Sequence, residues 1–356
     1  MQQLSAITKT LILTGFSALS LWTAPTQAAS FRGLGLPYSS YFSSYYANGV
    51  SADGSVIAGR SDYIIDSIPV SSEAFRWTES GGMVDLGYLP DDFSYSDANG
   101  VSADGSVIVG SSTSFNGRKA FRWTESGGMV SLGDLPGGDS FSQANGVSAD
   151  GSVIVGSSDS VNGIEAFRWT ESGGMVGLGD LPGGSFSEAN GVSADGSVIV
   201  GRSDSVNGDE AFRWTESGGM VSLGDLPGGD SNSYANGVSA DGSVIVGRSY
   251  GDNGNEAFHW TQGKGMVSLK ETLIGKGLDV SGWTLYSATA ISADGFTIVG
   301  NGINPSGQRE GWVANLSPEP IPEPLTILGS IAAIAFGAGF ERKFNKNKSE
   351  EKDPEN

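Results

Sequence analysis

Cysteine is absent from the 356 residues of this sequence, and histidine occurs only once. Without cysteine the chain forms no disulfide bonds, so packing alone has to hold its folded part together. Catalysis by Cys–His or Ser–His–Asp groups lacks a required partner, and no cluster of His and Cys suits zinc. The single histidine, His259, stands where four copies of a repeated sequence carry arginine (Arg76, Arg122, Arg168 and Arg213). We interpret His259 as a substituted strand residue and not as a general base.

Positive charge is also scarce, because 20 Lys and Arg residues face 40 Asp and Glu residues, for a net charge of -20. This balance disfavours nucleic acid and acidic polymers as partners unless a cation bridges them. The glycine-rich strings GGMVSLG and LPGGDS lack the lysine of a phosphate-binding loop, and they recur, which favours turns. The sequence therefore predicts no nucleic-acid partner and no cofactor.

Repetition is what the sequence has in abundance. A block of roughly 46 residues recurs, and such a period is typical of repeat architectures in which one supersecondary unit is stacked many times. The string Ser-Ala-Asp-Gly marks each copy, and a tryptophan follows each one. The strings begin at Ser51, Ser102, Ser148, Ser193, Ser239 and Ser292, and the tryptophans are Trp77, Trp123, Trp169, Trp214, Trp260 and Trp312.

Each repeat contains signals for four short strands. In the third copy, residues 144–148 lead through Asp150 and Gly151 into residues 152–156, and Asp-Gly between two such runs is a hairpin signal. The apolar triplet 153–155 is typical of a strand that is buried on both faces.

The second half of the repeat continues the pattern. Alternation places Phe167 and Trp169 on one face of a third strand and Arg168 on the other, and it places Val176 and Leu178 on a common face of a fourth. Four strands per repeat predict an all-β fold, a six-bladed β-propeller over residues 29–316.

The last copy ends at REGWVANL, residues 309–316, without the LGDLPGG string that closes the others. At the other end of the chain FRGLGLP, residues 31–37, aligns with MVSLGDLP. We expect the N-terminal strand to complete the sixth blade, a strand exchange that closes the ring and removes exposed edges. An open solenoid is the alternative, and it would carry distinct polar capping units.

Both chain ends carry hydrophobic segments. Residues 1–28 combine Lys9, an apolar run over residues 11–22 and small residues, which predicts a signal peptide cut by signal peptidase before Ala29. Residues 325–340 predict a short transmembrane helix, and the charged tail 341–356 would hold that end in the cytoplasm. The stop-transfer cations of this tail are Arg342, Lys343, Lys346 and Lys348.

The linker 317–324 ends in Pro322, Glu323 and Pro324. This motif, followed by a short helix and a basic cluster, resembles the PEP-CTERM sorting signal of bacterial exported proteins. The resemblance implies a transient membrane anchor that an exosortase-type peptidase recognises and processes, and then a cell-surface or extracellular location. The extension KSEEKDPEN departs from the family pattern, and an ordinary tail anchor is the alternative.

The strings AFRWTESGGMVSLGDLPGG and ANGVSADGSVIVG resemble the HAF repeat of exported bacterial proteins, and SADGSVIVG resembles the hairpins of WD-type propeller repeats. Because the HAF family is defined by its repeats, the resemblance implies a fold and a location and not an activity.

Two departures from the repeat are candidate partner surfaces. One is a tyrosine cluster (Tyr38, Tyr41, Tyr45 and Tyr46), which suits glycan or protein ligands. The other is the insertion 269–283, where Leu269, Leu273 and Ile274 would share one side of a short helix that covers or plugs the ring. The aspartates of the six Asp-Gly turns are expected to bond their local backbone, with a calcium site as the alternative.

These observations predict an exported, non-catalytic binding or structural module of the cell envelope or extracellular matrix. One alternative is a propeller enzyme, a glycosidase or lyase that acts on polysaccharide. Such an enzyme would need carboxylates that differ from blade to blade. The other alternative is a calcium-stabilised adhesin.

Overall fold

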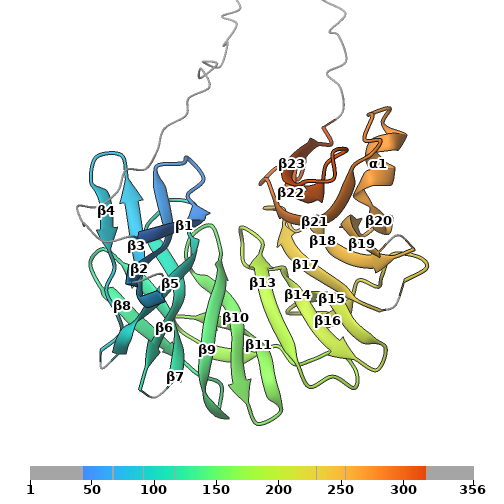
Figure 1. Cartoon of the computed structure of the whole chain (residues 1–356). Helices are drawn as coiled ribbons and strands as arrows, with labels where there is room; N and C mark the ends of the chain where they lie inside the picture. The colour runs from blue at the N-terminus through green and yellow to red at the C-terminus, as the bar shows by residue number, and fades with distance from the viewer. Residues whose placement is uncertain are drawn as a thin grey trace, which may run out of the picture. The chain divides into compact units, whose positions relative to one another are not determined.

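The computed structural model describes residues 43–317 except 66, 67, 91, 116, 230 and 253. This part of the chain forms successive antiparallel sheets, which Figure 1 colours in chain order. The first sheet contains β1 (Ser43–Val50), β2 (Val56–Ile65), β3 (Ile68–Thr78) and β4 (Gly82–Asp85). The second contains β5 (Asp92–Val101), β6 (Val107–Ser114), β7 (Gly117–Thr124) and β8 (Gly128–Gly133), and the third contains β9 (Gly137–Val147), β10 (Val153–Ser160), β11 (Gly163–Thr170) and β12 (Gly174–Gly177).

The fourth sheet contains β13 (Ser187–Val192), β14 (Ile199–Ser205), β15 (Gly208–Thr215) and β16 (Gly219–Ser222). The fifth contains β17 (Ser233–Val238), β18 (Val244–Gly251), β19 (Gly254–Thr261) and β20 (Gly265–Ser268), and the helix α1 (Leu269–Gly275) follows it. The sixth has three described strands, β21 (Thr284–Ile291), β22 (Thr297–Ile303) and β23 (Arg309–Asn315). Single parallel pairs, Ser72 with Tyr95 and Arg118 with Phe141, link the first three sheets at their edges.

The predicted Asp-Gly hairpins are confirmed. In the third sheet Gly151 has φ of 73°, the left-handed conformation that glycine adopts without strain. Ser148 Oγ donates to Asp150 Oδ1 at 2.7 Å and accepts from the Val153 amide at 2.9 Å. The turn is thus held by its own side chains, which fixes the register between β9 and β10.

Side-chain burial confirms most of the predicted faces. Val153, Ile154 and Val155 are all buried, and Phe167 is fully buried with Trp169 packed beside it. The prediction that Val176 and Leu178 share a face is wrong, since Val176 is exposed while Leu178 packs against the core. The alternation breaks after β12 ends at Gly177, and the Leu178 amide then donates to the Ala166 carbonyl.

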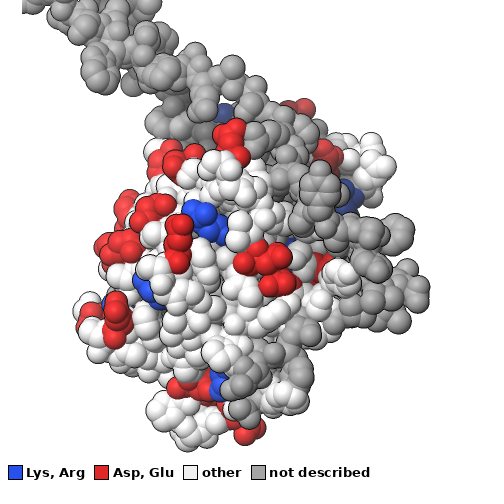
Figure 2. All heavy atoms as spheres, turned by 90° about the vertical axis from the view of Figure 1, so that its left-hand side faces the viewer, with Lys and Arg blue, Asp and Glu red and all other residues white. Residues whose placement is uncertain are grey.

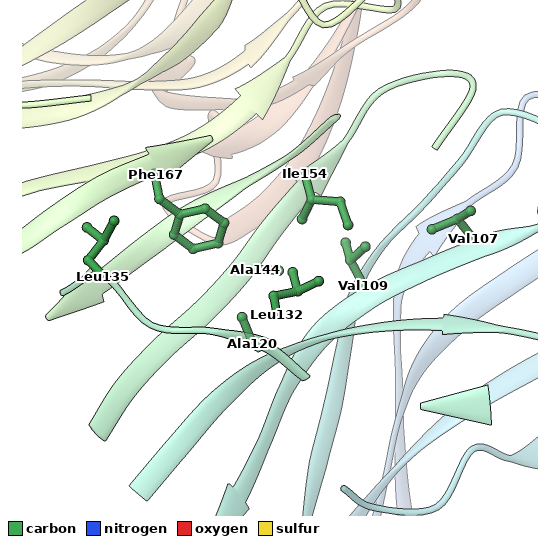
Figure 3. Close-up of a cluster of buried hydrophobic side chains, with 8 residues drawn as sticks. All are labelled: Val107, Val109, Ala120, Leu132, Leu135, Ala144, Ile154 and Phe167. Carbon is green, nitrogen blue, oxygen red and sulfur yellow. The ribbon is translucent and has the colours of Figure 1, made fainter. Parts of the chain in front are cut away.

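Adjacent sheets share hydrophobic cores. Figure 3 shows the cluster between the second and third sheets. The second sheet contributes valines of β6, Leu132 of β8 and Leu135, which follows β8. The third sheet contributes Ala144, Ile154 and Phe167. Equivalent clusters fill four further junctions between successive sheets. Each sheet is therefore stabilised mainly by its neighbours in the chain.

Two hydrogen bonds also recur at each of these five junctions. In the first strand of a sheet, a β-bulge leaves an asparagine outside the hydrogen-bonded ladder. The side-chain amide of this asparagine donates to an alanine carbonyl of the next sheet, as in Asn190 Nδ2 to Ala235 O at 2.9 Å. A backbone bond joins the neighbouring hairpins, as in Ala194 N to Ala240 O at 3.0 Å. The other asparagines of the series are Asn48, Asn99, Asn145 and Asn236.

The innermost strands of all six sheets line one channel. Its walls consist of repeated Gly and Val residues with Asn236, Thr289, Ala290 and Ile291. Four-stranded antiparallel sheets whose first strands surround a common channel are the blades of a β-propeller.

The sixth sheet differs from the others in register. Trp312 pairs with Gly300, as Phe167 pairs with Gly156, so Trp312 occupies the position of the core phenylalanine. Trp312 follows the sixth Ser-Ala-Asp-Gly string, but it does not take the place of the other tryptophans, because it is opposite Gly300 whereas Trp169 is opposite Ile154. Ala314 occupies the tryptophan position instead and is buried.

Helix α1 confirms the predicted short helix but not all of its face. Leu269 and Leu273 are buried, whereas Ile274 is exposed, because five residues rotate a helix by about 140° from the starting side chain. The buried leucines join the core between the fifth and sixth sheets, where other junctions use the leucines of LGDLP. The helix thus covers a sheet junction and does not line the channel.

The predicted signal peptide, the strand 31–37, Tyr38, Tyr41, the motif Pro322–Pro324, the helix 325–340 and the tail cations lie outside the described residues. Over residues 43–317, no helix has the length and apolar character needed to cross a membrane.

Candidate functional site

A series of polar clefts lies between neighbouring sheets. The turn between the first two strands and the turn between the last two strands lie at the same end of each sheet, because the start of β2 pairs with the end of β3. Between the first and second sheets, Arg76 of one sheet faces the Asp104–Ser106 turn and the segment Arg122–Ser126 of the next. This cleft has a volume of about 650 Å³.

The same cleft recurs at the two following junctions. Between the second and third sheets its equivalent residues are Arg122, the turn at Asp150, and the segment Arg168–Ser172. Between the third and fourth sheets they are Arg168, the turn at Asp195, and Arg213–Ser217. The chain therefore presents one set of groups, Arg, Trp, Thr, Glu and Asp, at least three times along one end of its sheets.

Among the described residues, the arginines of these clefts have no carboxylate partner. Within residues 43–317, Arg76, Arg122, Arg168 and Arg213 form no ion pair, and the buried Nε of Arg76 has no hydrogen-bond acceptor. Arg60, outside the clefts, lies 2.9 Å from Asp62 and 3.1 Å from Asp97. The cleft guanidinium groups are therefore available to acceptors of a ligand.

The aspartates of the clefts are anionic at neutral pH. Hydrogen bonds from the hydroxyl of Ser102 and from the amide and hydroxyl of Ser106 lower the pKa of Asp104 to about 2, and similar bonds lower the pKa of Asp195 to about 2. The predicted backbone role of these residues is confirmed. No group of three or more His, Asp or Glu residues in the described chain could hold a metal ion.

The two described tyrosines of the predicted cluster do not lie in the clefts. Tyr46 is exposed and stacks under Arg60, whose guanidinium carbon is 4.7 Å from the ring centre. Tyr234 makes the same cross-strand contact with Arg248 in the fifth sheet, so Tyr46 occupies a repeated position. Tyr45 is half-buried beside it.

His259 marks the end of the arginine series. It is buried, and its Nε2 lies 2.8 Å from Thr272 Oγ1 of helix α1. Burial, with a smaller contribution from Lys264, lowers the pKa of His259. The sequence showed the substitution and the adjacent insertion separately. Only the fold shows that the helix covers the substituted residue.

No protein-family model matches this sequence, and no curated protein matches it either. Solved structures with a similar arrangement include TolB from Acinetobacter baumannii, at 15% identity and a TM-score of 0.43 over 63% of this chain and 53% of that one. A putative TolB from Agrobacterium tumefaciens gives 14% identity and a TM-score of 0.45 over 77% and 91% of the two chains. Prolyl oligopeptidase B from Galerina marginata gives 10% identity and a TM-score of 0.48 over 80% of this chain and 44% of that one. The chain thus spans about half the length of the first and less than half of the last.

Proposed function

We propose that this chain is an exported, non-catalytic binding module whose repeated clefts bind a neutral, hydroxyl-rich polysaccharide. The observation that carries the proposal is the series of unpaired arginines, each beside a half-buried tryptophan, a glutamate and an anionic aspartate. Guanidinium groups donate to sugar hydroxyls, carboxylates accept from them, and indole rings pack against the apolar faces of sugar rings. One cleft thus offers each kind of contact that a sugar with adjacent hydroxyls needs.

The charge of the protein favours a neutral ligand over an acidic one. Acidic side chains are spread over the face in Figure 2 with few basic ones between them, in keeping with the net charge of -20. A polyanion would be repelled at long range. A repeating neutral polymer is not repelled, and it can occupy several equivalent clefts at once, which raises its overall affinity.

A catalytic role has less support. The three clefts among the described residues present the same residue types, and the described residues that line the channel have no titratable side chain. A glycosidase or lyase needs two carboxylates with different environments. We therefore propose binding without turnover. A calcium-stabilised adhesin remains the second alternative, and it predicts a lower melting temperature after chelation.

The proposal includes location. The signal peptide, the Pro-Glu-Pro motif, the apolar segment 325–340 and the basic tail support export, temporary anchoring and processing by an exosortase-type peptidase. Mass spectrometry of the mature protein and fractionation of cells test this part. A chain that begins at Ala29 and ends near Pro324 is expected, and an intact tail in the membrane fraction contradicts processing.

The proposal also includes closure of the six sheets into a ring, with residues 31–37 as the fourth strand of the sixth sheet. The three described strands of that sheet and the sequence alignment of residues 31–37 support it.

Binding is tested by screening the folded protein against neutral polysaccharides, such as dextran, mannan and β-glucan, and against acidic alginate. The double variant Arg122→Gln/Arg168→Gln should weaken binding of the neutral polymer at least about tenfold, since it alters all three described clefts. The matched control Arg118→Gln/Arg248→Gln removes the same charge from two exposed arginines outside the clefts. Equal losses in both variants, or preferred binding of alginate, contradict the proposal.

A further inference from the structure

The junction between the sixth and first sheets is incomplete within residues 43–317. Five hydrophobic clusters join the six sheets in chain order, and none joins the sixth to the first. Val299 of β22 is 39% exposed, whereas the equivalent valines of four other sheets are fully buried (Val109, Val155, Val200 and Val246). Ala47 of β1 is exposed, although its equivalents are buried. Apolar side chains of the sixth and first sheets are therefore exposed at positions that neighbouring sheets cover elsewhere.

Four of the five complete clusters contain two leucines from LGDLP, from the related LGYLP of the first sheet or from helix α1, and the cluster between the third and fourth sheets contains Leu178 of LGDLP. The sixth sheet supplies no such pair within its described strands. The segment 31–37, FRGLGLP, contains Leu34 and Leu36 in the corresponding place, although the aspartate between the leucines is missing from it.

The register of the regular sheets predicts how this segment pairs. In the third sheet Trp169 is opposite Met175, Arg168 is opposite Val176, and Phe167 is opposite Gly177. The equivalent residues of β23 are Ala314, Val313 and Trp312. We align Gly33 and Leu34 with Gly177 and Leu178. This alignment places Phe31 opposite Ala314, Arg32 opposite Val313, and Gly33 opposite Trp312.

We propose that residues 31–37 pair with β23 in this register, because it sets Arg32 opposite Val313 and so reverses the Arg–Val pair that the first four sheets share. The large–small pair Trp169 and Met175 becomes small–large, Ala314 and Phe31. The pair Arg168 and Val176 becomes Val313 and Arg32. The second exchange keeps the same two side chains and moves the charged one to the partner strand. The first places the larger side chain on the partner strand but leaves less total volume, because Ala and Phe together are smaller than Trp and Met. Leu34 and Leu36 then complete the sixth core.

The length of the connecting chain permits this placement. Between Pro182 and Ser187, the first residue of β13, four residues connect one sheet to the next. Tyr45 is the residue equivalent to Ser187, and seven residues separate it from Pro37. The longer connection can span the same path. The inference rests on the closed ring of the proposed function and not on its ligand.

Cysteine pairs test the register, since the protein contains no native cysteine. Residues directly opposite on antiparallel strands have Cβ atoms about 4.5–5.5 Å apart, near disulfide range, whereas diagonal neighbours are about 7–8 Å apart. Under mild oxidation, full-length protein with Arg32→Cys/Val313→Cys or with Phe31→Cys/Ala314→Cys should form an intramolecular disulfide in at least one pair. The shifted pair Arg32→Cys/Asn315→Cys should not.

The outcomes separate register from closure. A disulfide only in the shifted pair overturns the register and leaves the ring closed. No disulfide in any pair overturns both. A disulfide-linked dimer shows that a second copy supplies the strand. Polysaccharide binding by the unmodified protein is measured separately and bears only on the ligand. As a second readout, Ala314→Trp should lower the melting temperature by several degrees, and adding Phe31→Met should restore at least half of the loss; no restoration overturns the pairing.

Discussion

The asparagine that bridges adjacent sheets can be tested with a nearly isosteric change. Asn190→Asp keeps the shape of the side chain but replaces the amide donor with a carboxylate oxygen, 2.9 Å from the Ala235 carbonyl. Ala235 is fully buried, so its carbonyl loses a hydrogen bond and faces a negative charge. Leaving a buried polar group without its partner costs about 1–3 kcal/mol. A change of 2 kcal/mol lowers the melting temperature of a domain of this size by roughly 4–8 °C.

Thermal and urea unfolding measure this loss, with Asn162→Asp as the control. Asn162 lies exposed in the turn between β10 and β11, so the control adds the same charge without removing a bridge. The destabilisation of Asn190→Asp should shrink near pH 3, where the new carboxyl becomes protonated and can donate again. A loss below about 0.5 kcal/mol, or an equal loss in the control, refutes the assignment of Asn190 as a stabilising bridge.

Three further predictions concern single residues. A methyl group on Gly201 would lie 1.9 Å from the Glu188 carbonyl oxygen, so Gly201→Ala should lower the free energy of unfolding in urea by about 3 kcal/mol or more. As the control, Gly179 has φ of 74° and open space around it, so Gly179→Ala should lower it by only about 1–2 kcal/mol. The pKa of Asp195 is about 2 when folded, against an ordinary value of 3.8, so the unfolded chain binds a proton first as pH falls. The stability advantage over Asp195→Asn should therefore be present above pH 4 and disappear between pH 4 and 2, and an advantage that does not vary with pH contradicts this. Burial lowers the pKa of His259 below 6.5, so the unfolded chain again binds the proton first and stability should fall as pH drops from 7 to below 6; His259→Gln should remove that part of the pH dependence, and identical pH profiles would exclude it.

The sequence predicted those features that depend on one repeat. Asp150-Gly151 marks a hairpin because the turn is closed by residues within a few positions, and residues 153–155 are buried as their pattern indicates. Predictions failed where alternation is interrupted. Leu178 packs in the core because the strand breaks after Gly177, and in the second sheet the equivalent Leu132 lies at a register shift.

The candidate site could not be predicted in the same way. Each cleft combines an arginine of one repeat with an Asp-Gly turn of the next, as in Arg76 with Asp104 and Arg122 with Asp150, so no single motif contains it. The place of Trp312 in the core does not follow from its residue type, because it depends on the register that sets it opposite Gly300. The cover that α1 places over His259 depends on packing between the fifth and sixth sheets, which leaves no periodic signal in the sequence.

The identical bonding between successive sheets makes the interior repeats interchangeable modules. Loss or gain of one whole repeat by recombination between near-identical copies would join surfaces that already fit, with an asparagine bridge on one side and an alanine carbonyl on the other. The sixth sheet cannot take part in such exchange. It has Thr289 in place of the asparagine, with its hydroxyl turned back to the Val299 carbonyl of its own sheet. Gain or loss of an interior repeat would therefore keep the junctions but change the number of sheets in the proposed ring, whereas the sixth repeat, with Thr289, is not equivalent to the others.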